Sequence, residues 1–156
     1  MSIEEDVLDS PGCYVLALII EDNLEVRTRS SFFKIPRGIY FYVGSAKGPG
    51  GVKNRVFRHL LRNGRRHWHI DYLLDSVRAR VAGFYTIPSK RGVDCEVEAA
   101  KALSTALKPV LGFGSTDKIG DVSHLYMCSY RLEECLGLVY ELLSEKVCEP
   151  SWFQNI

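Results

Sequence analysis

The apolar run from Gly12 to Ile20 places the strongest constraint on what this chain can fold into. It reads GCYVLALII, it contains no charged side chain, and it is followed by the turn residues Asp22 and Asn23. A short apolar run bounded by a turn is typical of a strand buried inside a domain. Its longest uninterrupted part, Tyr14 to Ile20, is far shorter than the roughly 20 residues of a membrane-spanning helix. We therefore expect a fold built on a well-buried strand.

Two further strands are expected directly after this one. They cover Leu24 to Phe33 and Ile39 to Ser45, and the turn residues Pro36, Arg37 and Gly38 separate them. The later strand is rich in aromatic residues and ends in a glycine-rich loop at 48–51. Three strands joined by short connections predict an antiparallel meander.

The spacing of apolar residues then changes from strand-like to helical. Val52, Val56 and Leu60 recur at the spacing of one helix face, and Asn63-Gly64 is a helix stop signal. The remaining segments are a short helix at 70–76, a strand at 77–87, a helix at 93–107, a glycine-rich loop at 109–121, a strand at 124–130 and a helix at 132–146. No repeat or linker divides the chain. We predict a single α+β domain over residues 1–156, an α/β sandwich with a small, mainly antiparallel central sheet flanked by helices. Its core spans about 10–130, and the C-terminal helix spans about 132–146.

Composition and cysteine usage suggest a globular protein of a reducing compartment. Hydrophobic residues make up 46% of the chain and charged residues 25%, which is neither disordered nor fibrous. The acidic segment Met1–Asp9 is the opposite of the positive start of a signal peptide, so a cytoplasmic location is expected. The five cysteines include no Cys-x-x-Cys pair. We expect them to be small buried hydrophobes rather than a disulfide framework or a zinc site.

The near-neutral net charge of +1 hides a strong asymmetry along the chain. No acidic residue occurs between Glu25 and Asp71, whereas that stretch holds eleven of the 20 basic residues. They are Arg27, Arg29, Lys34, Arg37, Lys47, Lys53, Arg55, Arg58, Arg62, Arg65 and Arg66. Such a block is either a solvated surface or a site for a polyanion, of which nucleic acid is a more common example than a membrane surface.

A pair of tyrosines precedes the basic helix. Tyr40 and Tyr42 are two residues apart in a strand, so they project from the same face. They could simply pack on that face, but the strand ends near Gly44, where the backbone could approach a phosphate closely. In the helix that follows, Arg55, His59 and Arg62 share one face.

The helix at 93–107 carries an acidic residue on its apolar side. Its apolar positions are Val93, Val97, Ala100, Leu103 and Leu107, and Glu96 lies along them. A buried carboxylate needs a partner, which a divalent metal or an arginine could supply. Glu98 lies on the polar face and is expected to be solvated.

Taken in order, these motifs resemble the GIY-YIG nuclease superfamily. The matching series runs Gly12-Cys13-Tyr14, then Tyr42 to Lys47, then Arg55 to His59, then Glu96. The chain looks more closely like the group catalogued as domain of unknown function 123, whose features recur here as Tyr42 to Gly48, Arg58-His59, His67 to Tyr72, Cys95-Glu96 and Gly112 to Ser115. The resemblance spans about residues 10–130.

The literal letters Gly38-Ile39-Tyr40 are not the first motif of that superfamily. Its two tyrosine motifs lie on different strands, whereas Tyr40 and Tyr42 share one. Gly12-Cys13-Tyr14 fills the first position, with cysteine in place of isoleucine. The long spacing from Tyr14 to Tyr42 is explained by the extra strand expected at 24–33.

The resemblance implies a reaction and a catalytic set. Relatives hydrolyse a phosphodiester with one divalent cation, so Glu96 would hold Mg²⁺ or Mn²⁺. Tyr14 would act as general base or water-positioning group, aided by Arg55 or the metal, because the reference pKa of tyrosine is about 10. Tyr42 would orient the water, Arg55 would stabilise the developing phosphorane charge, and His59 would relay a proton.

The same resemblance and the basic block supply a set of expected nucleic-acid contacts. It consists of Gly44, Ser45, Lys47, Lys53, Arg58, Arg62, Arg65, Arg66, His67 and His69. His67 and His69 could instead be structural. The loop Gly112 to Asp117 and His124 are expected to border the site, or else to form only a turn.

The leading functional hypothesis is a metal-dependent endonuclease acting on DNA rather than RNA, in a DNA repair setting. Some relatives are joined to a repair glycosylase, which suggests a repair-protein partner. The alternative is a nucleic-acid-binding module that has lost the reaction. A membrane-surface role ranks third, because the basic helix offers only Phe57 for insertion and Phe57 is assigned to the core.

Overall fold

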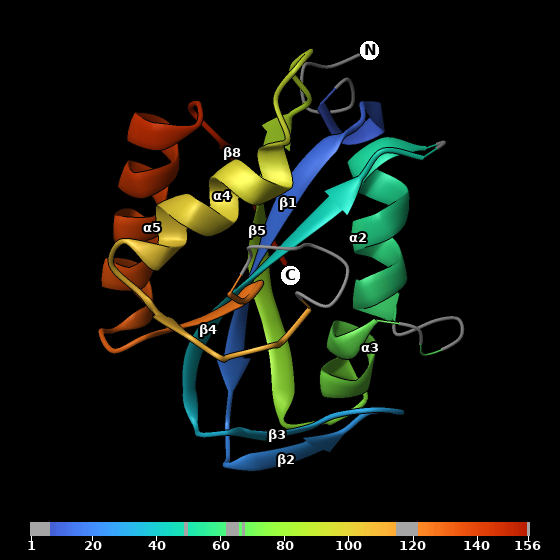
Figure 1. Cartoon of the computed structure of the whole chain (residues 1–156), viewed down its shortest axis with the longest axis vertical. Coiled ribbons are helices and arrows are strands. Elements are labelled where there is room, and N and C mark those ends of the chain that lie inside the picture. The colour runs from blue at the N-terminus through green and yellow to red at the C-terminus, as the bar shows by residue number, and fades with distance from the viewer. Residues whose placement is uncertain (1–6, 49, 62–65, 67, 115–121, 156) are drawn as a thin grey trace.

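A computed structural model describes residues 7–48, 50–61, 66, 68–114 and 122–155. Its central element is β1 (Gly12–Ile20), which pairs on one side with β4 (Gly38–Ala46) and on the other with β5 (Ala79–Pro88), both antiparallel. This arrangement is drawn in Figure 1. Side chains of β1 enter a hydrophobic core on each face of the sheet, and this burial on both faces explains its apolar sequence.

Three shorter strands complete a six-stranded antiparallel sheet in the order β6-β7-β4-β1-β5-β8. β7 (Leu125–Cys128) pairs with β4 and with β6 (Lys108–Pro109), and β8 (Ser151–Gln154) pairs with β5. The predicted α+β class with a small antiparallel central sheet is confirmed.

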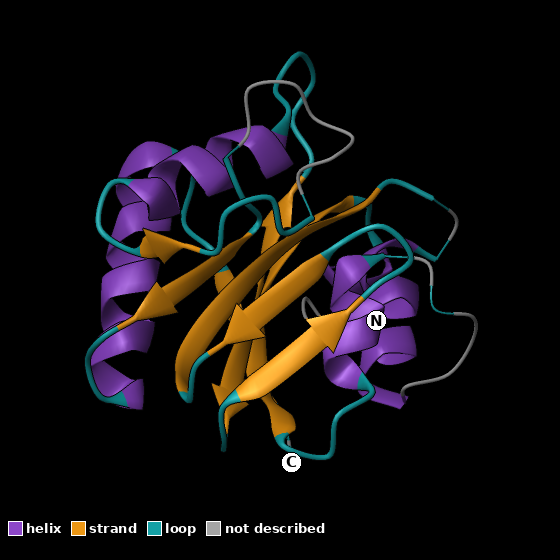
Figure 2. Ribbon diagram, turned by 60° about the horizontal axis from the view of Figure 1, so that its bottom comes forward, coloured by secondary structure: helices purple, strands orange, loops and turns teal. Residues whose placement is uncertain are grey.

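Helices cover both faces of the sheet, with the strands between them in Figure 2. The core on one face includes residues of α2 (Gly51–Leu61) and α3 (His69–Leu74). The core on the other face includes residues of α4 (Cys95–Ser104) and α5 (Leu132–Lys146). Since side chains alternate along a strand, Tyr14 faces the side of α2 and α3, whereas its neighbour Cys13 faces the side of α4 and α5.

The predicted meander is wrong, because 24–33 is not a single strand. It contains β2 (Leu24–Arg27) and the start of β3 (Phe32–Ile35), which form a separate two-stranded sheet. A turn divides them: the Ser31 N–H donates to the Thr28 hydroxyl oxygen at 3.0 Å. The polar run Thr28 to Ser31 supports this turn because short hydroxyl side chains bond to nearby backbone groups. The two strands β6 and β8 were not predicted from the sequence either.

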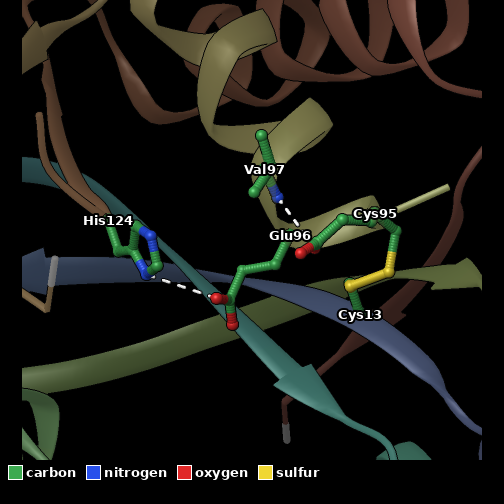
Figure 3. The surroundings of a disulfide bond; sticks show 6 residues. Cys13, Cys95, Glu96, Val97 and His124 are labelled. Carbon is green, nitrogen blue, oxygen red and sulfur yellow. Dashed lines mark hydrogen bonds and ion pairs between the residues drawn. A yellow bond between two sulfur atoms is a disulfide. The ribbon is translucent and has the colours of Figure 1, made fainter. Parts of the chain in front are cut away.

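The expectation of unpaired cysteines is also wrong. Cys13 is bonded to Cys95 and Cys128 to Cys135, while Cys148 is free. All four bonded residues are buried, as expected. Their pairing was missed because the fold brings Cys13 and Cys95 together across 82 positions, a proximity that spacing alone does not reveal. Figure 3 shows this disulfide beside Glu96.

Phe57 does not belong to the core. Its exposed fraction is 39%, and that of Leu61, one turn further along α2, is 72%. The predicted helix at 93–107 is shorter than expected and begins at Cys95, where the Asp94 side chain accepts a hydrogen bond from the Val97 N–H. Among the described residues, no helix is both long and apolar enough to cross a membrane.

Candidate functional site

A cavity of about 270 Å³ opens where β1, β4, α2 and the start of α4 come together. It brings together residues from distant parts of the sequence. Its lining consists of Tyr14, Tyr42, Gly44, Ser45, Lys47, Gly48, Arg55, Trp68, Glu96, Gly114 and His124. Four of the five predicted catalytic residues therefore line one cavity. The fifth, His59, is hydrogen-bonded to one of them, Tyr14.

The position of Tyr14 depends on a glycine in the neighbouring strand. Tyr14 and Gly44 are cross-strand partners in the β1–β4 pair. A Cβ atom on Gly44 would lie 2.3 Å from Cζ of Tyr14, well inside van der Waals contact. Gly44 borders the cavity, as expected, but the space left by its missing side chain is filled by the tyrosine ring.

The Tyr14 side chain is buried, and its hydroxyl lies within hydrogen-bond distance of a histidine. Its hydroxyl oxygen lies 2.8 Å from Nε2 of His59. Burial is the largest cause that raises the pKa of Tyr14 well above 10, and Tyr42 and Glu96 act in the same direction. Arg55 lowers the pKa of Tyr14, as the sequence suggested, but its effect is smaller than that of burial. The raised pKa keeps the Tyr14 hydroxyl protonated at neutral pH, and the tautomer of His59 sets whether that hydroxyl donates to Nε2 or accepts from it.

Asp71 stands behind His59, on the side away from Tyr14. Its Oδ1 lies 3.5 Å from Nδ1 of His59, while its Oδ2 accepts the N–H of Trp68 at 2.9 Å. Arg58 approaches the same carboxylate, with Nη2 at 3.8 Å from Oδ2. Sequence reasoning did not select Asp71. The spacing from Trp68 to Asp71 at the start of a helix is a capping signal that could have pointed to it.

Glu96 reaches the cavity from the first turn of α4. It is buried, and its Oε1 lies 3.9 Å from Nδ1 of His124, as drawn in Figure 3. The start of a helix is a favourable place for a carboxylate because the helix dipole is positive there. The sequence predicted a metal or an arginine as its partner, which stays a prediction, and His124 is one neighbour of the carboxylate in the structure.

His124 is held in place by the backbone of its neighbours. Its N–H donates to the carbonyl of Phe113 at 2.8 Å, and its own carbonyl accepts the N–H of Val43 at 2.8 Å. His124 thus extends the β4–β7 contact to the cavity. It lines the cavity, where the sequence analysis expected it to lie beside the site.

The donor set of the cavity fits a magnesium or manganese ion held by one carboxylate. In the described part of the chain no three histidine, cysteine, aspartate or glutamate residues are grouped to hold a metal. Mg²⁺ does not need such a group, because it keeps several waters and binds through one or two carboxylates together with substrate phosphates. Glu96 supplies one hard oxygen ligand of this kind.

His69 builds the wall of the cavity without lining it. Its Nδ1 accepts the N–H of Gly114 at 2.8 Å, and its ring packs against Phe33 and Phe113 at centroid distances of 5.1 and 5.5 Å. Gly114 itself has a φ of +72°, and a Cβ there would lie 3.2 Å from Cβ of His124. These contacts correspond to the packing alternative considered for His69.

The structure brings some of the expected nucleic-acid contacts to the cavity and places other described members elsewhere. Ser45 and Lys47 line it. Lys53 is exposed on α2, with its ammonium 5.9 Å from the Phe57 ring, and Arg66 pairs with Asp75 at 3.0 Å. Three members of the set, Arg62, Arg65 and His67, lie outside the described residues, as does the loop from Ser115 to Asp121.

The comparisons with known proteins give one match. The family model described as "Domain of unknown function DUF123" matches residues 13–145. No curated protein and no solved structure matches the chain.

Proposed function

This chain belongs to the family described as domain of unknown function DUF123, and for this member of it we propose a divalent-metal-dependent endonuclease that hydrolyses phosphodiester bonds in DNA. The observation that carries the proposal is the shared cavity. Two tyrosines, an arginine and a carboxylate, predicted as a catalytic set from the ordered sequence motifs, line one space of about 270 Å³: Tyr14, Tyr42, Arg55 and Glu96. Had these side chains been dispersed, binding without cleavage would be the better reading.

The cations of the cavity account for substrate binding. Arg55 and Lys47 both line it, and a guanidinium can donate two parallel hydrogen bonds to phosphate oxygens. In this half-enclosed position the Arg55 charge would stabilise the extra negative charge that develops on the phosphate during attack.

The protein's own proton transfer begins at Tyr14. The attacking water forms its oxygen–phosphorus bond while its proton passes to the Tyr14 oxygen, and the Tyr14 proton passes to Nε2 of His59. The bond from phosphorus to the leaving oxygen breaks, and that oxygen takes a proton from solvent. His59 then returns its extra proton to solvent. This route uses the protonated Tyr14 found at neutral pH, so it does not require a free tyrosinate before substrate binds.

Tyr42 and Glu96 complete the assignment. Tyr42 lines the same cavity and would orient the attacking water through its hydroxyl. Glu96 would hold the Mg²⁺ or Mn²⁺ ion, which when bound polarises the phosphate and stabilises negative charge on the leaving oxygen.

A cleavage panel tests the proposal. Supercoiled plasmid, branched DNA, damaged duplex and RNA are incubated with the protein and Mg²⁺ or Mn²⁺. We expect cleavage of DNA that is abolished by EDTA and reduced at least about 10²-fold by Glu96→Ala and by Arg55→Ala, the size of effect seen when one charge-stabilising group is removed. Glu98→Gln is the matched control, because Glu98 lies on the same helix turn but is half-exposed and pairs with Lys101.

Two outcomes would overturn the proposal. Cleavage that survives Glu96→Ala and Arg55→Ala unchanged would remove the assigned mechanism. DNA binding without cleavage by the unaltered protein, with either metal, would identify a nucleic-acid-binding module instead.

A further inference from the structure

We propose that Asp71 is a positioning residue for this reaction, which fixes His59 in the tautomer whose Nε2 can accept the Tyr14 proton. The inference rests on the proposed function for its chemical meaning. It concerns a chain of three side chains from three elements: Tyr14 on β1, His59 on α2 and Asp71 on α3.

The Asp71 carboxylate is held in place independently of His59. Its Oδ2 accepts the N–H of Trp68 at 2.9 Å as α3 begins, and Nη2 of Arg58 lies 3.8 Å from the same oxygen. The remaining oxygen, Oδ1, is the one nearest the imidazole, at 3.5 Å from Nδ1. The backbone at the start of α3 and the Arg58 side chain thus hold the carboxylate in position beside His59.

Nδ1 of His59 is buried and makes no hydrogen bond to the described residues, but the carboxylate oxygen 3.5 Å away favours hydrogen on that nitrogen. An ionised carboxylate accepts hydrogen bonds and donates none, so the favourable arrangement has the hydrogen on Nδ1. Nε2 then carries the lone pair and faces the Tyr14 hydroxyl at 2.8 Å. In the opposite tautomer Nδ1 would present its lone pair to the carboxylate, and Nε2 could no longer take a proton from Tyr14.

Burial makes this electrostatic preference strong. The His59 side chain is 1% exposed and the Asp71 side chain 12%, so water screens their interaction little. The carboxylate also stabilises the imidazolium that exists after the Tyr14 proton arrives. An aspartate plays the corresponding role behind the histidine of Ser-His-Asp hydrolases, where its replacement by asparagine leaves the geometry intact but disables the histidine.

The competing explanation is that Asp71 only caps α3. Asp71→Asn separates the two roles. The amide oxygen can still accept the Trp68 N–H and preserve the cap, while the amide N–H₂ group faces His59 as a donor. The variant therefore keeps the helix start and favours the wrong tautomer.

The first test needs neither DNA nor metal. Ring ¹⁵N chemical shifts, assigned to His59 by comparison with His59→Gln, report which nitrogen is protonated. We expect hydrogen on Nδ1 in the unaltered protein and on Nε2 in Asp71→Asn. Asp75→Asn is the matched control: it removes the same charge one turn later on an exposed side chain and should leave the His59 shifts unchanged. A wild-type His59 with hydrogen on Nε2 would overturn the proposal, whatever the variant does.

The second test measures single-turnover cleavage at saturating DNA. Asp71→Asn should slow cleavage by about 10²-fold or more, the range of a lost acid–base step, with DNA affinity and thermal midpoint unchanged. A variant that cleaves normally would overturn the proposal. If the unaltered protein cleaves nothing, the proposed function fails, and the ¹⁵N shifts still decide whether Asp71 sets the tautomer.

Discussion

At Gly44, a single missing methyl group allows Tyr14 to take its place across the sheet. The two residues face each other in the β1–β4 pair, and the tyrosine ring occupies the volume where a side chain would begin. The same ring supplies the hydroxyl that meets His59. Backbone pairing, side-chain packing and the Tyr14–His59 contact thus depend on one another at one residue pair.

Gly44→Ala should therefore displace the ring. A Cβ at 2.3 Å from Cζ of Tyr14 cannot be accommodated without movement, and an overpacked core site costs about 1–3 kcal/mol of unfolding free energy. We expect that loss in chemical denaturation, together with loss of DNA cleavage because Tyr14 moves away from His59.

Gly137→Ala is the control for this change. Gly137 lies within α5, and a Cβ there meets nothing within 4 Å. Because alanine favours a helix interior more than glycine does, this substitution should raise the unfolding free energy by up to about 1 kcal/mol. Equal effects of the two substitutions would contradict the packing role of Gly44.

At the scale of elements, one covalent bond fixes the two halves of the candidate site to each other. Cys13 directly precedes Tyr14 on β1, and Cys95 directly precedes Glu96 at the start of α4. The disulfide therefore joins the strand that carries Tyr14 to the helix that carries Glu96. The second disulfide joins β7 to α5 by bonding Cys128 to Cys135, and neither of these residues lines the cavity.

Opening the two disulfides should have different consequences. In the chain-entropy description, a bond closing 82 residues stabilises by about 4.5 kcal/mol and one closing seven by about 2.4 kcal/mol. Replacing both Cys13 and Cys95 by serine should thus lower the unfolding free energy more than replacing both Cys128 and Cys135. Only the first change should slow cleavage measured well below the melting temperature. Equal slowing by both pairs would show that general stability, and not the link between β1 and α4, matters.

The sequence predicted elements better than it predicted their partners. Helix α5 has the expected bounds, Leu132–Lys146, and β1 has the expected bounds, Gly12–Ile20, because local periodicity carries both. The β2–β3 hairpin was read as one strand, since the turn at Thr28 contains no glycine or proline to mark it. Strand β8 was missed because it is a four-residue addition to the edge of the sheet beside β5.

The candidate site, like the fold, was predicted in part from the sequence. Tyr14, Tyr42, Arg55 and Glu96 were found because they belong to ordered motifs, and the structure places them around one cavity. Asp71 and the disulfide partners escaped because each contacts a residue on a different element of the fold. Their roles depend on helix packing and on the order of strands, which no local pattern contains.

At the scale of the whole molecule, one basic helix and one acidic helix lie on different sides of the sheet. The described basic helix α2 packs on one face, whereas α5 packs on the other, as their labels in Figure 1 show. Exposed glutamates are found on α5, including Glu133 and Glu141.

This separation predicts a charge-specific salt dependence of DNA binding. Each cation that contacts a phosphate contributes about −0.9 to the slope of log affinity against log salt concentration. Lys53→Gln, on the exposed side of α2, should make the slope shallower by about that amount. Lys146→Gln, at the end of α5, removes the same charge from the other side and should leave the slope unchanged. The measurement is a fluorescence-anisotropy titration of duplex DNA at several salt concentrations, and equal slopes for both variants would contradict the assigned face.

Because side chains alternate along β1, the Cys13–Cys95 disulfide depends on the register in which β1 pairs with its neighbours. A slip of one position would turn Cys13 toward α2 and Tyr14 toward α4, exchanging the two layers of the molecule. Cys13 would then point away from Cys95, and the bond between them could not close. A chain can form this crosslink when β1 is in the correct register. Molecules that carry the disulfide are therefore molecules in which Tyr14 faces His59. The Cys13–Cys95 bond therefore holds β1 in the register that places Tyr14 beside His59.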